Sequence, residues 1–337
     1  MKKFIISILL SAAFMAAPSV YSRAQSVCRL EPDMTILLYP QGQDAPEGLP
    51  EAEGAKVSNG IMKPEWYDET GRIGSISDSA RVDIYIPKKC NGQMVVVCPG
   101  GGYRYVSALK EGLHVADWMV ERGIAVAVVK YRMPEGHWEI PLTDVQNAFR
   151  YCRAHAGEWG VSQIGVMGFS AGGHLAASAS TLYADEATRP DFSVLIYPVV
   201  SLERKFKGQG TRNNLLGKDE MWDDRNRTVG EFEEVQALYS RLLTHYTLDN
   251  HIDENTPAAF IAHCCDDRQV PVEHSIRYYT KLTGCNVPTE MHIYPSGGHG
   301  WGFSSERWKG KGNDKFAYAR PDFEAALERW LEGIRTK

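Results

Sequence analysis

The sequence predicts an α/β protein with a mostly parallel central sheet and helices on both faces of that sheet. Short, almost wholly apolar runs alternate with amphipathic segments of helical spacing along most of the 337-residue chain. A strand without polar alternation is typical of a sheet that is buried on both faces, and strands that alternate with helices form parallel sheets. With 43% hydrophobic residues, the chain can also bury a sizeable core.

The expected elements follow one another in a regular order. Gly123 is of a residue type that commonly ends helices, and Pro141 is of a type that commonly begins them, so each bounds an amphipathic segment. Strands are expected at 81–87, 94–99, 124–132, 163–168, 192–200, 258–263 and 290–295. Helices are expected at 112–123, 141–156, 169–180, 272–284 and 323–334.

Two segments lie outside this alternation. Residues 1–24 begin with Lys2 and Lys3, continue with an apolar run too short to span a membrane comfortably, and end in small residues, as a signal peptide does. We therefore expect a secreted or periplasmic protein whose residues 25–337 form one domain without a membrane span. Residues 201–256 are polar and aromatic, and we expect them to form an insertion over the carboxyl edge of the sheet, where ligands bind.

Charge and cysteine content exclude several classes of protein. Loss of the signal peptide would remove three cations and take the net charge from −5 to −8, which argues against nucleic acid or an anionic membrane as a partner. The seven cysteines are odd in number and lack the spacing of a zinc site, so we expect mostly buried free thiols with one bridge at most. The histidines show no ligand spacing either, and neither a metal nor an organic cofactor is expected.

Ser170 lies in the segment 168–172, which reads Gly-Phe-Ser-Ala-Gly and fits the motif G-x-S-x-G. The motif alone is weak because glycine and serine are common in turns. Here a buried strand precedes it and a helix follows, which is the context that exposes a nucleophilic hydroxyl at a sharp turn. The N–H of Ala171, at the start of that helix, is then available to a developing oxyanion.

A serine nucleophile needs a base and an acid, and both are expected later in the chain. His299 lies in a glycine-rich loop after the last strand and is the expected base, whereas His292 and His263 lie within or at the end of strands and are expected to be structural. Asp266 and Asp267 follow a strand end, and we favour Asp267 as the acid. The order Ser, Asp, His is that of the α/β-hydrolase fold.

A second glycine-rich loop, Pro99-Gly-Gly-Gly-Tyr, follows the strand at 94–99. Three consecutive glycines let the backbone approach a substrate carbonyl, so the N–H groups of Gly101 and Gly102 are expected to complete an oxyanion hole with that of Ala171. Tyr103, next in the chain, and Trp301, close to the expected base, are the candidate substrate-binding side chains.

Taken together, these segments resemble the α/β-hydrolase superfamily and, more narrowly, the secreted esterases grouped with acetylxylan and feruloyl esterases. The matching segments span residues 94 to 303 and include VVVCPGGGY, VMGFSAGGHLAA and HIYPSGGHGWGF. The resemblance implies Ser170 as nucleophile, Asp267 as acid and His299 as base. Many related esterases have histidine where this chain has Pro99, which removes one orienting side chain and leaves the backbone donors.

The sequence thus predicts hydrolysis of a carboxylic ester through an acyl-enzyme. The expected substrate is an acetylated plant polysaccharide or its oligosaccharides, and the alternative is a feruloyl or other short-chain aryl ester. A peptidase of the prolyl-oligopeptidase type is disfavoured because only about 55 residues of the mature chain precede the first expected strand, too few for a propeller. A binding protein on the same fold would usually lack a triad member, and none is lacking here.

Overall fold

The computed structural model describes residues 30–39, 64–77, 80–206, 209–223, 227–304 and 314–335. The signal peptide expected at residues 1–24 and Cys28 lie outside these ranges. Within them, no helix combines the length and the apolar character needed to cross a membrane.

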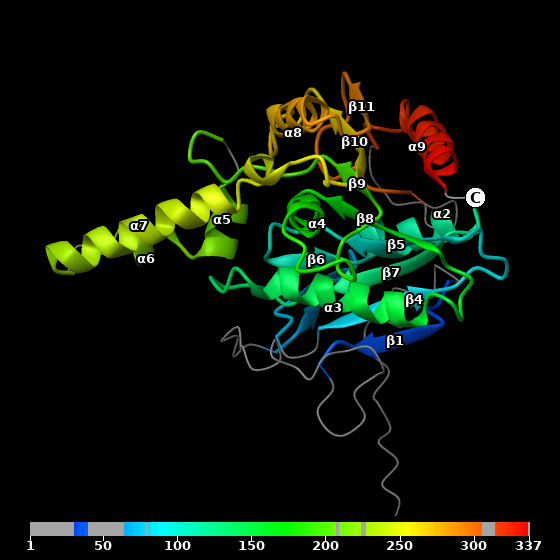
Figure 1. The fold of residues 1–337 in the computed structure, drawn as a ribbon, viewed down its shortest axis with the longest axis horizontal. Helices are drawn as coiled ribbons and strands as arrows, with labels where there is room; N and C mark the ends of the chain where they lie inside the picture. Colours follow the sequence, from blue (N-terminus) through cyan, green and yellow to red (C-terminus); the bar gives the residue numbers. More distant parts are fainter. Residues whose placement is uncertain are drawn as a thin grey trace, which may run out of the picture.

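Eight strands form the central sheet. They are β1 (Met34–Leu37), β4 (Arg81–Tyr85), β5 (Gln93–Cys98), β7 (Ala125–Lys130), β8 (Gln163–Phe169), β9 (Phe192–Ile196), β10 (Ala258–Cys264) and β11 (Thr289–Tyr294). Their order across the sheet is β1-β4-β7-β5-β8-β9-β10-β11 (Figure 1). β4 pairs antiparallel with β1 and with β7, and all pairs from β7 to β11 are parallel. The predicted fold class is confirmed.

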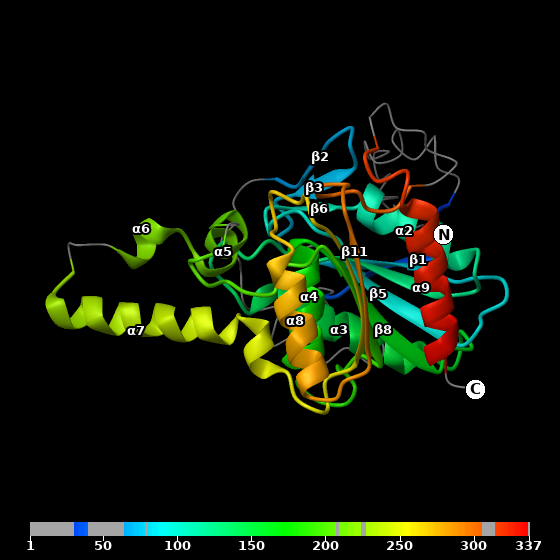
Figure 2. The same ribbon diagram turned by 90° about the horizontal axis from the view of Figure 1, so that it is seen from above.

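Helices cover both faces of this sheet because its strands are apolar on both faces. In β5, Met94 and Val96 face one hydrophobic cluster, and Val95 and Val97 face the other, as the two-residue period of a strand requires. The first cluster is covered by α3 (Ile140–His155), α4 (Ala171–Thr181) and α8 (Glu273–Gly284). The second cluster is covered by α2 (His114–Val120) and α9 (Arg320–Ile334), on the other side of the sheet in Figure 2.

A second, three-stranded antiparallel sheet was not predicted. It consists of β2 (Trp66–Tyr67), β3 (Arg72–Gly74) and β6 (Tyr105–Ser107), in the order β2-β3-β6. Strands of two or three residues are too short to show an alternating pattern in the sequence. Because β6 begins three residues after Gly102, the last glycine of the run at 100–102, its pairing with β3 helps to hold that loop in place.

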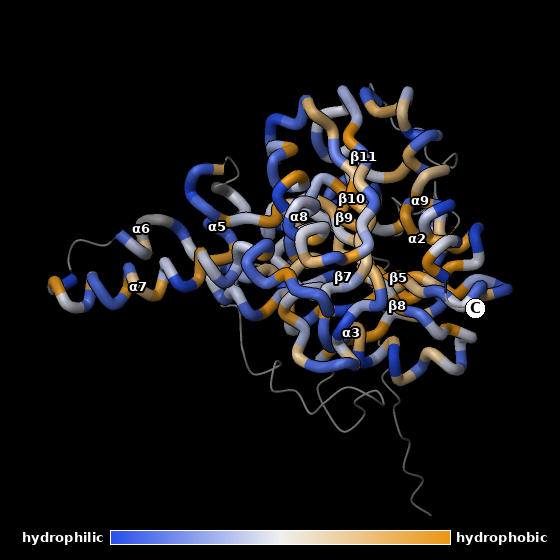
Figure 3. The backbone as a smooth tube through the Cα atoms, turned by 45° about the horizontal axis from the view of Figure 1, so that its top comes forward, coloured by the Kyte–Doolittle hydropathy of each residue, from blue (hydrophilic) through white to orange (hydrophobic). Residues whose placement is uncertain are grey.

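The insertion at 201–256 lies only in part where it was expected. It contains α5 (Gln209–Leu216), α6 (Asp219–Trp222), α7 (Val229–His245) and a 3₁₀ turn, η3 (Leu248–His251). α5 contacts the glycine loop, since the side chain of Asn214 donates to the carbonyl of Gly102 at 2.8 Å. α7 instead projects away from the body (Figures 1 and 2), and hydrophilic residues recur along it, whereas the strands are mostly hydrophobic (Figure 3). The prediction that the whole insertion covers the sheet edge is therefore wrong for α7.

All six cysteines in the described part of the chain are free thiols. Cys98, Cys152 and Cys264 are buried, and burial raises the pKa of Cys152 and of Cys264 to about 12. These thiols are therefore protonated and unreactive at neutral pH.

A buried ion pair joins the segment after β7 to α3, and removal of one of its partners should be costly. The Asp144 carboxylate accepts from the Arg132 guanidinium at 2.6 Å and from the Tyr39 hydroxyl at 2.6 Å. We expect Asp144→Ala to lower the free energy of unfolding by about 3–5 kcal/mol, because the buried Arg132 guanidinium would lose its carboxylate partner. Asp185→Ala is the control, which breaks the more exposed pair with Arg150 and a hydrogen bond from the Thr188 N–H, and it should cost less than about 2 kcal/mol. Equal losses in denaturant titrations would contradict this expectation.

Candidate active site

Ser170 lies at a strained turn between β8 and α4. Its φ of 55° and ψ of −120° lie outside the regions that non-glycine residues ordinarily adopt, and this geometry exposes the hydroxyl at the carboxyl edge of the sheet. The flanking glycines are required by close packing. A Cβ at Gly172 would lie 2.1 Å from the carbonyl oxygen of Cys98, and one at Gly168 would lie 2.1 Å from the carbonyl oxygen of Gly172.

The structure brings Ser170, His299 and Asp267 together in one hydrogen-bonded chain. The Nε2 atom of His299 lies 2.8 Å from the Ser170 hydroxyl oxygen, and its Nδ1 atom lies 2.6 Å from an Asp267 carboxylate oxygen. Because a carboxylate only accepts, Nδ1–H donates to Asp267 and Nε2 is free to accept from the serine. The other Asp267 oxygen accepts the backbone N–H groups of Gln269 and Val270, both at 2.9 Å.

His263 is a second imidazole beside the same carboxylate. It is fully buried, and its Nε2 atom lies 2.9 Å from the carbonyl oxygen of Val270 and 3.3 Å from Asp267. Its Nδ1 atom lies 2.8 Å from the Ser275 hydroxyl, which fixes the ring. Burial alone would raise the pKa of Asp267, but hydrogen bonds from His263 and His299 outweigh it and hold this pKa well below its usual range. Asp267 is therefore ionised at every pH at which the protein would work.

Asp266, the alternative acid, and His292, which was expected to be structural, both lie away from the contact between His299 and Ser170. Asp266 is exposed and accepts the backbone N–H of Gly298 at 2.8 Å, so it contacts the loop that carries His299 but not the imidazole. His292 lies within the edge strand β11. Of the two aspartates, Asp267 is the one that contacts His299.

The glycine loop packs directly against the turn at Ser170. A Cβ at Gly100 would lie 3.1 Å from that of Ser170 and 2.6 Å from the carbonyl oxygen of Phe169, so only glycine fits. The three glycine carbonyls accept hydrogen bonds, from Ser107 N–H to Gly100 at 2.9 Å, from Arg104 N–H to Gly101 at 3.0 Å, and from the Asn214 side chain to Gly102 at 2.8 Å.

A trans peptide holds its C=O and its N–H on opposite sides. The N–H groups of Gly101 and Gly102 therefore point away from the donors that bind the preceding carbonyls. Neither N–H has an acceptor among the described residues, and the same is true of the N–H of Ala171 at the start of α4. These are the three backbone donors that the sequence singled out.

The structure does not support the prediction that the side chains of Tyr103 and Trp301 bind substrate, because both rings are buried. Tyr103 is 2% exposed, and its hydroxyl lies 2.9 Å from Nδ1 of His174. Trp301 is 5% exposed, stacks on Phe316 with a centroid distance of 3.9 Å and meets Tyr197 edge-on. Packing on all sides leaves neither ring a face for a sugar or an acyl group.

His174 holds the glycine loop against α4. Its ring is fully buried; its Nε2–H donates to the carbonyl of Tyr246 at 2.9 Å, and its Nδ1 accepts from the Tyr103 hydroxyl. Burial lowers the pKa of His174 to about 4. Protonation would remove the acceptor for Tyr103, so the neutral ring is the one that fits.

The sequence did not single out two residues that contact the glycine loop, Asn214 and Glu111. Glu111 is buried and accepts the Gly100 N–H at 2.7 Å. Asn214 belongs to the insertion, where no motif marks it. Glu111 belongs to the polar stretch Lys-Glu-Gly, which suggests an exposed position. The only feature of the sequence that could have marked it is an acidic residue next to a mostly apolar helix.

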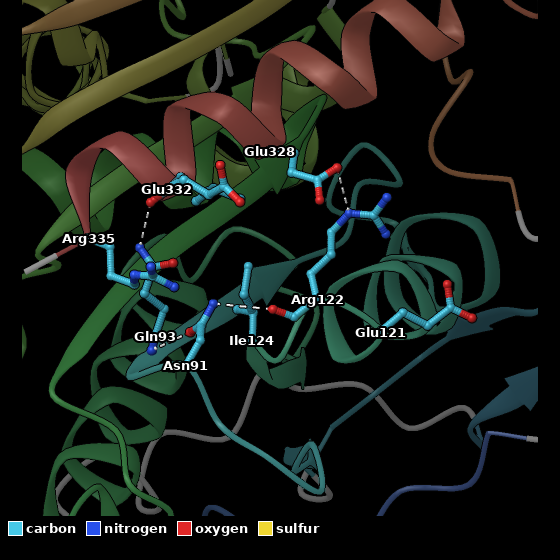
Figure 4. A pocket seen from close by; sticks show the side chains of 9 residues that line it. Asn91, Gln93, Glu121, Arg122, Ile124, Glu328, Glu332 and Arg335 are labelled. Atoms are coloured by element: carbon cyan, nitrogen blue, oxygen red, sulfur yellow. Dashed lines mark hydrogen bonds and ion pairs between the residues drawn. The ribbon is translucent and has the colours of Figure 1, made fainter.

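One cavity lies at the amino ends of the parallel strands, at the opposite edge of the sheet from Ser170. It measures about 250 Å³ and is lined by Asn91, Gln93, Glu121, Arg122, Ile124, Glu328, Leu331, Glu332 and Arg335 (Figure 4). Gln93 begins β5 and Cys98 ends it, so the length of this strand separates the cavity from the glycine loop. Polar groups in it already bind one another, as Arg122 and Glu328 do at 3.1 Å. Among the described residues, no cluster of acidic, histidine or cysteine side chains could hold a metal ion.

A model of the BD-FAE family matches residues 82–282 of the chain. A protein named acetylxylan esterase from Xylanibacter ruminicola is 36% identical over 236 residues, which are 68% of this chain and 46% of that protein. A protein named endo-1,4-beta-xylanase B from Butyrivibrio fibrisolvens is 30% identical over 222 residues, which are 61% of this chain and 32% of that protein. The chain thus spans less than half the length of these relatives.

Solved structures confirm the α/β-hydrolase fold. An acetyl ester-xyloside bifunctional hydrolase from Caldicellulosiruptor lactoaceticus is 28% identical, superposes with a TM-score of 0.62, and is matched over 90% of this chain and 97% of that chain. The carboxylesterase Cest-2923 from Lactobacillus plantarum gives a TM-score of 0.59 over 81% of this chain and 98% of that chain. At 20% identity, the second likeness concerns the fold alone.

The buried neutral histidines should make stability depend on pH. Between about pH 6.5 and pH 4, the unfolded chain binds a proton at His174 that the folded chain does not, so the free energy of unfolding falls as the pH falls. His274, whose pKa burial lowers to about 3, acts in the same direction, and the lowered pKa of Asp267 adds to the decline from about pH 5 downward. We expect urea titrations to show a shallower decline for His174→Gln than for the wild type. If the free energy of unfolding fell equally steeply with pH in both proteins, a buried neutral His174 would be contradicted.

Proposed function

The chain belongs to the BD-FAE family, and from this premise we propose that it is a serine carboxylesterase. In this proposal Ser170 is the nucleophile, His299 is the general base and Asp267 is the acid that orients the base. The single observation that carries the proposal is the continuous hydrogen-bonded chain through these three residues, with distances of 2.8 and 2.6 Å.

The first half of the reaction forms an acyl-enzyme. His299 Nε2 takes the proton of the Ser170 hydroxyl as its oxygen attacks the ester carbonyl carbon. The carbonyl oxygen becomes an oxyanion, which the N–H groups of Gly101, Gly102 and Ala171 bind. When the tetrahedral intermediate collapses, the bond to the alcohol oxygen breaks, and the imidazolium gives its proton to the leaving alcohol. Asp267 stabilises the imidazolium while it exists.

The second half releases the acid. Water enters where the alcohol left, His299 takes one of its protons, and the resulting oxygen attacks the acyl carbon. A second oxyanion forms in the same backbone site, and its collapse breaks the bond to Ser170, which regains its proton from His299. These steps use only side chains and backbone groups of this chain together with water.

We propose acetyl groups on xylan or related plant polysaccharides and oligosaccharides as the substrate. The names of the relatives from Xylanibacter ruminicola and Caldicellulosiruptor lactoaceticus support this class. A feruloyl or short-chain aryl ester is the second candidate, and its support is the resemblance of the sequence to the group that includes feruloyl esterases. The two differ in the size of the acyl group, so release of acetate and of ferulate from matched oligosaccharides separates them.

We propose that the enzyme acts outside the cytoplasm. The support is the basic start, apolar run and small-residue end of residues 1–24. Amino-terminal sequencing of the exported protein tests it, and a mature chain that begins near Gln25 is the expected result.

Replacement of the nucleophile should abolish turnover. We expect Ser170→Ala to lose about 10⁶-fold in kcat on an acetylated xylo-oligosaccharide, since removal of a triad nucleophile elsewhere costs this much. Acetate release by the wild type and by the variant is the measurement. Acetate release by Ser170→Ala at more than a thousandth of the wild-type rate would contradict the assignment of Ser170.

The two adjacent aspartates offer a matched pair for the acid. Asp267→Asn should lose about 10⁴-fold in kcat, because an amide in place of the carboxylate favours the wrong tautomer of His299. Asp266→Asn makes the same chemical change one residue away, where the side chain binds only a loop N–H. We expect this control to stay within about tenfold of the wild type. If the two variants lost similar activity, the assignment of Asp267 would be wrong.

A further inference from the structure

We propose that Glu111 is a positioning residue that joins the glycine loop to the loop carrying His299 and keeps both in the geometry that the transition state needs. The proposal rests on the esterase function proposed above. It concerns a buried acidic residue that lies outside the triad and outside the three backbone donors. Its side chain reaches both loops, directly on one side and through Tyr197 on the other.

Glu111 binds the glycine loop at its first glycine. One carboxylate oxygen accepts the Gly100 N–H at 2.7 Å, and Gly100 is the residue that packs against Ser170. Glu111 belongs to η2 (Leu109–Leu113), a π-helical turn that precedes α2. Such turns are rare and recur at functional sites.

Tyr197 extends the connection to the loop that carries His299. Its hydroxyl donates to the other oxygen of Glu111 at 2.7 Å and accepts the N–H of Gly302 at 2.9 Å, and its ring lies 4.8 Å from the imidazole of His299. Tyr197 directly follows β9 and has a φ of 38°, an unusual value for a non-glycine residue. The turn at the end of β9 therefore aims this side chain between the two loops.

The Gly100 N–H and the Tyr197 hydroxyl both donate to the buried Glu111 carboxylate, and each uses one of its two oxygens. Burial raises the pKa of Glu111, and the hydrogen bonds from Tyr197 and Gly100 oppose that shift. A glutamine of the same shape has one acceptor oxygen, so it cannot accept from the Gly100 N–H and from the Tyr197 hydroxyl at once. If its NH2 group donates to Tyr197 instead, the buried hydroxyl proton of Tyr197 loses its acceptor. Either replacement therefore weakens the same connection between the two loops, at the Glu111–Gly100 or the Glu111–Tyr197 bond for Glu111→Gln and at Tyr197 for Tyr197→Phe.

Replacement of Glu111 or Tyr197 should weaken stabilisation of the transition state more than it weakens substrate binding. The glycine loop supplies donors whose bonds strengthen as the oxyanion forms, and His299 moves the proton in the same step. A small displacement of either loop therefore lowers kcat while the substrate still binds. Because Glu111 and Tyr197 act as one unit, removing both should cost little more than removing one.

The test compares Glu111→Gln and Tyr197→Phe with Tyr39→Phe. The control also removes a buried tyrosine hydroxyl from a buried carboxylate, that of Asp144, 2.6 Å away on α3. We measure kcat and KM on an acetate ester, the affinity of a boronic acid that forms a tetrahedral adduct with the serine, and the midpoint of thermal unfolding. Amide hydrogen exchange of residues 99–103 and 296–303 gives a readout independent of activity.

We expect both site variants to lose about 10- to 100-fold in kcat and in boronic acid affinity, with KM within about threefold of the wild type. The double variant should have a kcat no more than about threefold below that of the less active single variant. Exchange should quicken in the glycine loop or the His299 loop. Tyr39→Phe should lower the unfolding midpoint but keep kcat within about twofold.

Two results would overturn the proposal: site variants with wild-type kcat, or losses that follow the unfolding midpoint as in Tyr39→Phe. A wild type without hydrolysis dependent on Ser170 would instead remove the proposed esterase function. Exchange in the two loops would then decide the role of Glu111 by itself, because unchanged protection in both site variants refutes it and quickened exchange supports it.

Discussion

The backbone turn at Ser170 is the constraint on which the rest of the site depends. A positive φ at a serine is tolerated only where the surroundings hold it, and here β8 on one side and α4 on the other leave no alternative path. The turn brings the start of α4 so close to the end of β5 that Gly172 touches the carbonyl of Cys98. The glycine loop begins at that point, so Ser170, the proposed nucleophile, and its expected oxyanion donors share one packing contact.

The parallel sheet brings the remaining parts together. β5, β8, β9 and β10 are neighbours and all run in the same direction, so the segments that follow them lie at one edge. These segments carry the glycine loop, Ser170, Tyr197 and Asp267 in turn, and the loop after β11 adds His299. Buried polar groups behind this edge, His263, His174 and Glu111, each bind at least two partners, and rigidity at the edge follows from their saturation.

The sequence predicted the large elements well because their hydrophobic patterns are unambiguous. The seven expected strands and the helices that cover the sheet are present, and so is the Ser170–His299–Asp267 contact. The pattern failed where structure depends on contacts between distant residues. Tyr103 was assigned to substrate from its position after the glycine run and Trp301 from its position near the expected base, but packing against His174 and Phe316 buries both rings. Glu111 and Asn214 were missed for the same reason, since their partners are remote in the chain or carried by the backbone, which no local motif records.

The central claim is that Ser170 carries the acyl group between the two halves of the reaction. The most direct test is mass spectrometry of peptides from samples quenched during turnover of an activated acetate ester. The account predicts a transient mass increase of one acetyl group on the peptide that contains Ser170, which accumulates within the burst and disappears when the ester is consumed. Turnover without any such adduct, or an adduct confined to another residue such as exposed Cys265, would contradict it.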